Sequence, residues 1–287
     1  MQSSIALSIG LPTALCIIML GLGLSLRLDD FARVIARPWP VVVGLICQLA
    51  LLPALCFVMV YFSGLPPAIC VGMMLLAASP SGTSAALYTH LARGDVALSI
   101  SLTAINSLIS IVSLPVIVNL SLLAFFGESG AVSLDLRQVA QLFGIAIVPA
   151  LIGGLIHSRY PSVAARLEKP VKILAILFLA TMVLVALVGQ WRLLLVWGPT
   201  VGVLALAFCL ASMGLGYWIP RLLNIERRQA VGLSMSIGLR NAALVIALAM
   251  SDRMLNNPEM AIPPAAYGLI AYIVGGLFVW RIRRNEG

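Results

Sequence analysis

Charged residues are scarce in this chain. They make up 10% of its 287 residues, whereas soluble domains carry about 25%. Hydrophobic residues make up 61% and the mean hydropathy is +1.08. Membrane helices need about 20 apolar residues each, so the chain has no length left for a separate soluble domain. We therefore expect an all-α polytopic membrane protein in which residues 1–287 form a single membrane domain.

The chain also lacks groups that would support chemistry inside a membrane. No Asp or Glu lies at membrane depth, and both histidines, His90 and His157, lie at the edges of predicted spans. The five cysteines form no CxxC pair and fall within apolar stretches, where they are expected to act as small buried hydrophobic residues. An intramembrane enzyme would need a nucleophile with a base, paired aspartates or clustered histidines. We therefore predict that the chain is not an enzyme and holds no cofactor.

Apolar stretches divide the chain into nine predicted spans, at residues 4–26, 38–62, 66–92, 96–126, 137–157, 170–190, 194–219, 229–251 and 259–280. When the loops are assigned alternately to two sides, most cations fall on one side, which is the positive-inside bias of membrane proteins. We therefore expect a cell (inner) membrane protein with its N-terminus outside and its C-terminus in the cytoplasm. The net charge of +8 then reflects topology and does not indicate nucleic-acid binding. The cations on that side are Arg27, Arg33, Arg37, Arg93, Arg159, Arg166, Lys169, Lys172, Arg221, Arg227, Arg228, Arg281, Arg283 and Arg284.

One cation lies inside the membrane. Arg240 stands in the middle of the apolar stretch 230–250, with apolar sequence on both sides. A guanidinium in hydrocarbon costs roughly 3 to 10 or more kcal/mol. Its position therefore requires a water-filled cavity, an anionic ligand or a dense set of backbone carbonyls. We interpret Arg240 as the functional centre of a membrane transporter.

Two predicted spans are interrupted at mid-membrane. The third contains segment 79–84, in which Pro80 removes a backbone donor and Gly82 tolerates an irregular backbone. The eighth contains segment 234–241, in which polar side chains surround Gly238. Either break alone has an ordinary explanation as a kink. Together, and with Arg240 in one of them, they indicate broken helices, which are tolerated at that depth only where they line a cavity or are buried in protein.

The two breaks occupy equivalent places if the chain consists of two repeats. Residues 1–127 would form a first repeat that lacks its opening helix, and residues 136–287 a second repeat of opposite orientation. Each repeat then has its broken helix next to last. Paired interrupted spans in inverted halves are typical of secondary transporters with a binding site at the bilayer midplane.

Four segments carry a resemblance to a known family. They are residues 21–26 (GLGLSL) followed by Asp30 and Phe31, Gln48 five residues before Pro53, residues 79–83 (SPSGT), and residues 91–99 (LARGDVALS) followed by 102–103 (LT). In type and spacing they resemble the signature of the bile acid:sodium symporter family, over nearly the whole chain. The resemblance implies a panel domain and a core domain, with two broken helices crossing in the core beside two sodium sites.

The departures from the family pattern concern the sodium sites. Where family members usually have Ser-Asn after the first break, this chain has Ala85 and Ala86. Where the second broken helix usually carries Glu and then Gln, both tied to sodium, this chain has Ser236 and Arg240. The ion-site positions that keep the family residue are Gln48, Ser99 and Thr103.

These replacements predict weak sodium binding. A dehydrated hard cation takes about six oxygens, preferably including a carboxylate, and here the carboxylate is missing. A fixed cation about 5 Å away would cost sodium about 3 kcal/mol at an effective dielectric of 20. We hypothesise that Arg240 stands in for the ion and that transport is independent of sodium or driven by another gradient. If sodium binds at all, Gln48, Ser99 and Thr103 are the expected ligands.

The same arrangement favours an anionic substrate. Two half-helix N-termini at the crossing would present free N–H groups and positive dipole ends. The resemblance places Thr83 and Asn241 beside the substrate pocket, next to Ser81 and Arg240, and a guanidinium holds a carboxylate through two hydrogen bonds. We expect a small organic anion, such as a carboxylate or sulfonate, as the transported partner. The oligomeric state stays open.

Two alternatives stay open as well. The chain could be a sodium symporter whose sites are rebuilt from Ser234, Ser236 and backbone carbonyls. A channel, receptor or structural membrane protein would share the composition, but not the paired breaks. Among the other polar residues, Asn106 and Asn119 are interpreted as hydrogen-bond partners between helices, and Asp95 as a helix N-terminal cap.

Overall fold

The computed structural model describes residues 38–82, 84–127, 136–167, 191–250 and 254–284, together with scattered positions within 16–24 and 170–181. In these ranges the chain is helical apart from turns and one isolated β-bridge, so the predicted all-α fold is confirmed. The predicted span 4–26 and most of the span 170–190 lie outside the described residues. The described elements are α3 (Trp39–Ile46), η1 (Cys47–Leu51), α4 (Leu52–Tyr61), α5 (Pro67–Ala78), α6 (Ser84–Leu91), α7 (Val96–Phe126), α8 (Leu136–Arg159), α10 (Trp191–Leu222), α11 (Arg227–Gly238), α12 (Ala242–Met250), η3 (Pro258–Ala261) and α13 (Ile262–Arg284).

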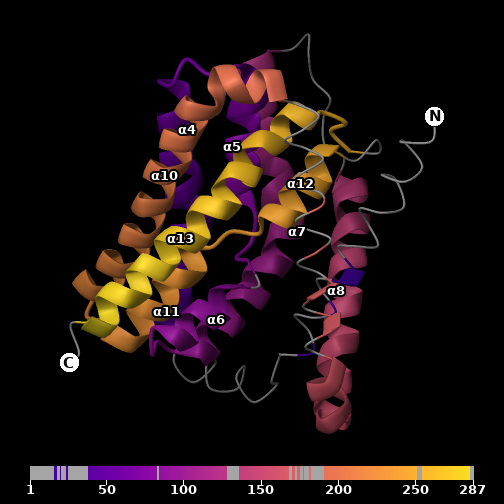
Figure 1. Ribbon diagram of the computed structural model, residues 1–287, viewed down its shortest axis with the longest axis vertical. Coiled ribbons are helices and arrows are strands. Elements are labelled where there is room, and N and C mark those ends of the chain that lie inside the picture. Colours follow the sequence, from indigo (N-terminus) through magenta and orange to yellow (C-terminus); the bar gives the residue numbers. More distant parts are fainter. Residues whose placement is uncertain are drawn as a thin grey trace.

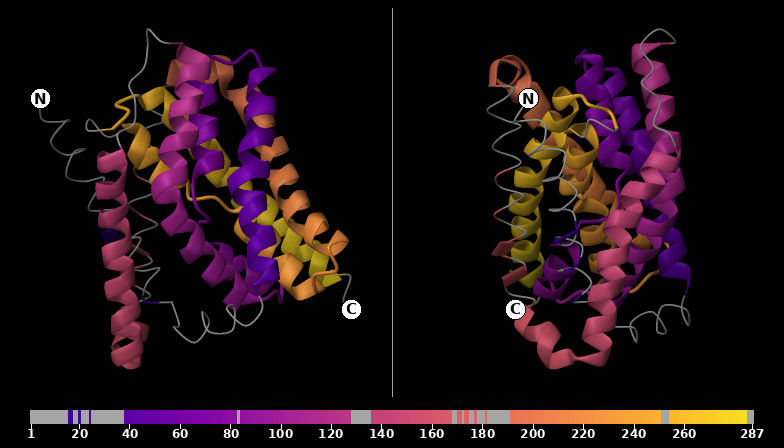
Figure 2. Two further views of the ribbon diagram at one scale, coloured as in Figure 1. Left: turned by 180° about the vertical axis from the view of Figure 1, so that it is seen from behind. Right: turned by 90° about the vertical axis from the view of Figure 1, so that its right-hand side faces the viewer.

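Several helices are long and apolar enough to cross a bilayer. Among the described residues these are Trp39–Tyr61, Leu195–Leu222 and Pro258–Arg284, and the bent pair Val96–Ser110 and Val112–Phe126 passes the same test as one span. The pairs α5/α6 and α11/α12 are divided by breaks, so each half is too short to span alone. Figure 2 shows α8 at the edge of the molecule, where it contacts α7.

The first break begins where proline stops α5. The amide of Ser79 still bonds to the carbonyls of Leu75 and Leu76, and the Ser79 hydroxyl donates to Leu76 O at 2.8 Å. Pro80 has no amide hydrogen and cannot continue this pattern. Ser79 accordingly adopts an extended conformation, with ψ at 152°. The second break is similar, because Leu239 is extended after α11 ends at Gly238.

The two breaks cross as a short antiparallel β-bridge between Ser81 and Arg240. The amide of Gly82 donates to Leu239 O at 2.6 Å, and the amide of Asn241 donates to Pro80 O at 3.0 Å. The bridge therefore satisfies backbone groups that helix would otherwise satisfy, as the membrane interior requires. Figure 1 shows α5 and α12 on one side of this crossing and α6 and α11 on the other.

The basic loops of the described chain meet at one end of the molecule. The amide of Asp95 donates to Arg228 O at 2.9 Å, and Arg227 Nη2 lies 3.5 Å from Ile282 O, so the α6–α7 and α10–α11 turns adjoin the C-terminal end of α13. Figure 1 shows this end at the bottom, with the C-terminus. The side chain of Asp95 accepts a hydrogen bond from the amide of Leu98 at 3.0 Å, which confirms the predicted N-terminal cap of α7.

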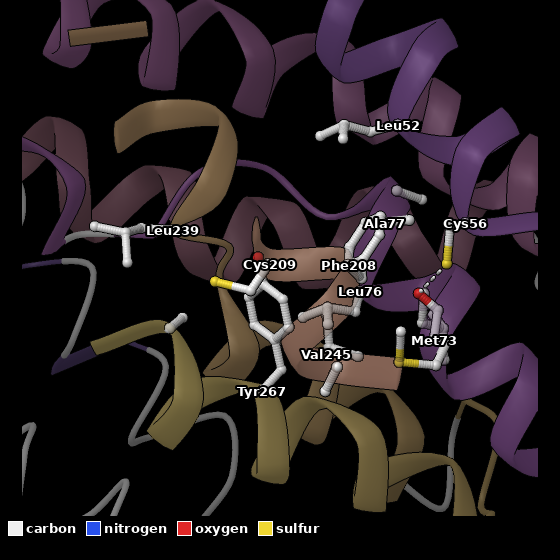
Figure 3. Packing of buried hydrophobic residues seen from close by; sticks show 14 of the residues in the cluster. Leu52, Cys56, Met73, Leu76, Ala77, Phe208, Cys209, Leu239, Val245 and Tyr267 are labelled. Atoms are coloured by element: carbon white, nitrogen blue, oxygen red, sulfur yellow. Dashed lines mark hydrogen bonds between the residues drawn. The ribbon is translucent and has the colours of Figure 1, made fainter. Parts of the chain in front are cut away.

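One apolar cluster, part of which is drawn in Figure 3, includes Ala77 before the first break and Leu239 in the second. The rings of Phe208 and Tyr267 pack with centroids 5.9 Å apart, and the thiol of Cys56 contacts Met73 O at 3.4 Å. Cys47, Cys56, Cys70 and Cys209 are buried and free. The prediction that these cysteines act as small hydrophobic residues is therefore confirmed for the four.

Candidate functional site

Arg240 is buried at the crossing and directs its side chain toward backbone carbonyls. Its side chain is 6% exposed. The guanidinium Nη2 donates to Ala77 O at 2.5 Å and lies 3.5 Å from Gln48 O. Of the three environments predicted for this cation, the described residues supply part of one, namely two backbone carbonyls and not a dense set.

The carbonyl of Ala77 belongs to the last turn of α5. The last carbonyls of a helix have no intrahelical partner and carry the negative end of the helix dipole. Because the chain leaves the helix at Ser79, the Ala77 oxygen needs a partner from outside α5. Arg240 supplies it, so a residue of the second break caps the helix that precedes the first break. A cation is favoured at this end of a helix.

The π-helical turn η1 leaves the carbonyl oxygen of Gln48 without its usual helical hydrogen-bond donor. The amide of Leu52 bonds to Cys47 O, five residues back, so it does not serve Gln48 O as an α-helical amide would. In the same register Gln48 O should accept from residue 53, but Pro53 has no amide hydrogen. The spacing of glutamine and proline noted in the sequence thus exposes a carbonyl oxygen inside the bundle. Arg240 lies against it.

The remaining charge of Arg240 is not balanced by the described residues. Its Nε and Nη1 atoms are buried and have no hydrogen-bond partner among the residues that the structure describes. The carboxylates in these ranges are Asp95, Glu226 and Glu259, each at the start of a helix. A guanidinium stays protonated in proteins. As far as the described residues show, the crossing therefore holds an uncompensated positive charge together with unused donors.

Gln48 links several helices through its side-chain amide. Its Nε2 atom lies 3.3 Å from both Ser81 Oγ and Ser236 O, and Asn106 Nδ2 donates to its Oε1. The Ser81 hydroxyl also donates to Ser236 O at 2.6 Å. One amide thus joins η1, the first break, α7 and α11. The predicted role of Asn106 as a partner between helices is confirmed.

The other predicted ion-site residues lie close to this amide. The hydroxyls of Ser99 and Ser236 are 2.7 Å apart, and the hydroxyl of Thr103 donates to Ser99 O at 2.8 Å. All three side chains are buried. These hydroxyls hold one another and the backbone by internal hydrogen bonds. Their oxygens keep free lone pairs, but they are uncharged and do not offset the charge of a sodium ion as a carboxylate would.

The predicted substrate-side residues are only partly described. Ser81 and Asn241 lie in the two arms of the crossing, while Thr83 lies outside the described residues. The side chain of Asn241 accepts from the amide of Leu244 at 3.1 Å and so caps α12. Amides expected to face a ligand are used locally, since Gly82 and Asn241 bond across the bridge and Ala85 bonds to Gly82 O at 3.1 Å.

Two groups that the structure places at the crossing were not among the predicted site residues. Ala77 contributes a backbone oxygen, and a backbone atom has no side-chain signal in a sequence. Tyr267 of α13 donates through its hydroxyl to Gly238 O at 2.5 Å, so it caps the end of α11 as Arg240 caps the end of α5. Nothing in the local sequence around Tyr267 distinguishes it from an ordinary membrane-helix tyrosine.

An all-helical membrane protein in which two interrupted helices cross is of the kind found among secondary transporters. The chain belongs to the Sodium Bile acid symporter family, whose sequence model matches residues 12–197. This membership confirms the resemblance seen in the signature segments. It also agrees with the prediction of a transporter rather than an enzyme.

Named relatives cover nearly the whole chain. It is 26% identical over 272 residues to the rice protein "Probable sodium/metabolite cotransporter BASS2, chloroplastic", covering 94% of this chain and 62% of that protein. It is 27% identical over 265 residues to the Bacillus subtilis protein "Uncharacterized sodium-dependent transporter YocS", covering 91% and 79%. It is 24% identical over 258 residues to the human "Ileal sodium/bile acid cotransporter", covering 88% and 73%. The chain thus spans less than two thirds of the rice protein.

Proposed function

We propose that the chain is a secondary transporter that moves a small organic anion by alternating access, with weakened or no sodium coupling. Arg240 takes the place of the bound ion. The observation that carries this proposal is the contact of its guanidinium with Ala77 O and Gln48 O. Helix-end and unwound carbonyls of this kind coordinate sodium in transporters with broken helices.

Electrostatics supports the exclusion of sodium. A sodium ion about 5 Å from the guanidinium would be disfavoured by about 3 kcal/mol at an effective dielectric of 20. This lowers the affinity for sodium more than a hundredfold. The carbonyl at the end of α5 is already used. The hydroxyls of Ser99 and Ser236 bond to each other, and neither supplies the negative charge that a carboxylate would.

An anionic substrate follows from the same charge. We assign substrate contact to Ser81, Thr83, Arg240 and Asn241, and structural support of the ion site to Gln48, Ser99, Thr103 and Ser236. The buried Nε and Nη1 atoms of Arg240 lack partners among the described residues, so an acceptor that entered the crossing would meet two unused donors. Charge-assisted hydrogen bonds of this type are about twice as strong as neutral ones.

The proposal includes the arrangement of the chain in the cell. Residues 1–127 and 136–287 would be inverted repeats of one transport domain in the cell (inner) membrane. The basic end that holds Arg93, Arg227 and Arg281 would face the cytoplasm because cytoplasmic loops carry excess Lys and Arg. The N-terminus would then lie outside.

A sodium symporter with rebuilt sites is the second candidate. The names of the relatives specify sodium, and the oxygens of Ser99, Ser236 and Thr103 gather in one place. The hydroxyl of Ser234, which would have to complete the site, donates to Met213 O of α10 at 2.8 Å. That contact favours the sodium-free proposal.

Counterflow in proteoliposomes separates the two candidates. A panel of labelled organic carboxylates and sulfonates would be tested with and without sodium, for wild type and Arg240→Gln. We expect saturable wild-type counterflow that is indifferent to sodium, and a variant that is inactive or has acquired a sodium response. Arg221→Gln is the matched control, because Arg221 also donates to a carbonyl, Ile225 O at 3.0 Å, but at the basic end. Wild-type uptake that rises steeply with sodium would refute the proposal, and unitary conductance without saturation would indicate a channel.

A further inference from the structure

The described core contains very few charged side chains. Arg240 is the one ionised side chain that the described residues place at the crossing, and it is buried there. The described carboxylates lie at helix starts, at Asp95, Glu226 and Glu259. Without substrate, the described part of the core therefore carries a single positive charge, which cannot leave because it is covalently part of the chain.

We infer that this carrier is an electrogenic anion uniporter whose net flux is driven outward by an inside-negative membrane potential. This inference rests on the proposed function and assigns to it the driving force and the direction. A tethered charge returns to its starting place in every cycle. The charge moved per turnover is therefore that of the substrate alone, which is one negative charge for a monoanion.

This reverses the usual effect of the potential on a cation-coupled carrier. Where two monovalent cations cross with one monoanion, positive charge enters and an inside-negative potential drives uptake. Where the cation is built in, only the anion crosses, so the same potential drives exit. One charge across about 100 mV corresponds to about a fifty-fold concentration ratio at equilibrium, with the anion more concentrated outside.

The location of the charge also predicts which step responds to voltage. With a monoanion beside Arg240 the core is close to neutral, so movement of the loaded core carries little charge. The empty core carries the guanidinium charge with it. Exchange of substrate for substrate uses only loaded cores and should be insensitive to potential, whereas net flux requires the empty core to return and should depend on it.

The test uses purified full-length protein in sodium-free liposomes whose potential is clamped with potassium and valinomycin. The probes are labelled lactate and labelled cholate, two monoanions of different size, used separately. We expect net movement toward the positive side, reversing when the potential is reversed, and exchange that is unchanged by potential. A probe-independent readout is the charge displaced by voltage jumps on substrate-free protein. It should be present in wild type and in Arg221→Gln and absent in Arg240→Gln.

The outcomes distinguish this inference from the function on which it rests. Sodium-dependent flux in wild type would refute both. Sodium-independent flux that ignores the potential, as an electroneutral proton symport would, overturns the inference and leaves anion transport standing. The inference is also overturned if neither probe moves and no charge is displaced in voltage jumps on wild type.

Discussion

Two side chains, Arg240 and Gln48, satisfy the backbone oxygens that the broken helices leave open. Arg240 serves Ala77 O, and Gln48 serves Ser236 O. The two are related, because the main-chain oxygen of Gln48 is also within 3.5 Å of the guanidinium. Loss of either residue should therefore affect the crossing as a whole.

The Gln48–Asn106 pair can be tested by a double-mutant cycle. Gln48→Leu removes the links to Ser81 and Ser236 and leaves the amide of Asn106 without its acceptor. We expect the free energy of unfolding to fall by about 1 to 3 kcal/mol, given the modest strength of hydrogen bonds between membrane helices. Asn106→Leu in the Gln48→Leu background should cost less than it does alone. The measurement is unfolding of purified protein in a graded detergent mixture.

Ser121→Ala is the control for that cycle. Ser121 is also buried on α7, but among the described residues its hydroxyl bonds to Ile117 O of its own helix and to no other helix. Its loss should change stability by less than about 0.5 kcal/mol. Additive effects of the Gln48 and Asn106 substitutions would mean that their contact does not contribute to stability.

At this scale the sequence predicts side chains better than backbone atoms. The helix break at Arg240, Asn106 between helices and Asp95 as a cap were all predictable, because a polar group in an apolar stretch has few outcomes. The use of Ala77 O was not, since every residue has a carbonyl and only tertiary structure selects one. The joining of Gln48 to Ser236, 188 positions apart, likewise depends on how the helices pack.

At the scale of elements, the π-turn Cys47–Leu51 and the two extended breaks create the site. The π-turn opens an oxygen at Gln48 only because Pro53 follows it at the right distance. The bridge between the breaks brings Arg240 next to α5. Each device can be altered by one substitution with a defined steric or hydrogen-bonding effect.

Pro53→Ala should weaken function without weakening the fold. The new amide at position 53 can donate to Gln48 O and compete with Arg240 for that oxygen. Alanine is also a better helix former than proline by about 3 kcal/mol in a helix interior. We expect sodium-free counterflow to decrease while the free energy of unfolding does not decrease. Pro199→Ala, within α10, is the control and should keep wild-type counterflow; equal losses in both variants would contradict the role of Pro53.

Gly82→Ala should disrupt the crossing. A Cβ atom at residue 82 would lie 2.8 Å from Arg240 O and 3.3 Å from Leu239 O, and neither backbone atom can move aside without breaking the bridge. We expect a loss of about 1 to 3 kcal/mol of stability, as for other overpacked sites, together with loss of counterflow. Gly276→Ala in α13 meets nothing within 4 Å and should behave as wild type in both assays.

The sequence predicted these elements unequally. The predicted spans 66–92 and 229–251 correspond closely to α5 with α6 (67–91) and α11 with α12 (227–250), since proline, glycine and hydropathy mark their ends and breaks. The π-turn was not predicted, although Gln48 and Pro53 were noted. The only trace of it in the sequence is the missing amide hydrogen of Pro53. That absence identifies Gln48 O as the unpaired oxygen only when the helical register is already known.

At the scale of the whole molecule, the described basic loops lie at one end, and the orientation of that end can be measured. Phe62, which follows α4, and Leu222, which ends α10, are 80% and 79% exposed. These two helix ends lie at opposite ends of the described bundle (Figure 1). We expect Phe62→Cys to react with a membrane-impermeant maleimide in intact cells, and Leu222→Cys to react only after permeabilisation, because the basic end should face the cytoplasm. The unsubstituted chain controls for its own cysteines. The reverse labelling pattern would invert the proposed topology. It would leave the direction of potential-driven flux unchanged, because that direction depends only on the charge of the substrate and the sign of the potential.

The covalent attachment of Arg240 has a consequence for how such a carrier would be restrained. A diffusing ion leaves its site when the ion is dilute in the medium. The empty ion site can then stop the carrier from changing conformation. A guanidinium that is covalently part of the chain is present at every ion concentration, so the ion site is never empty. Only the binding and release of substrate would then control how often the carrier changes conformation.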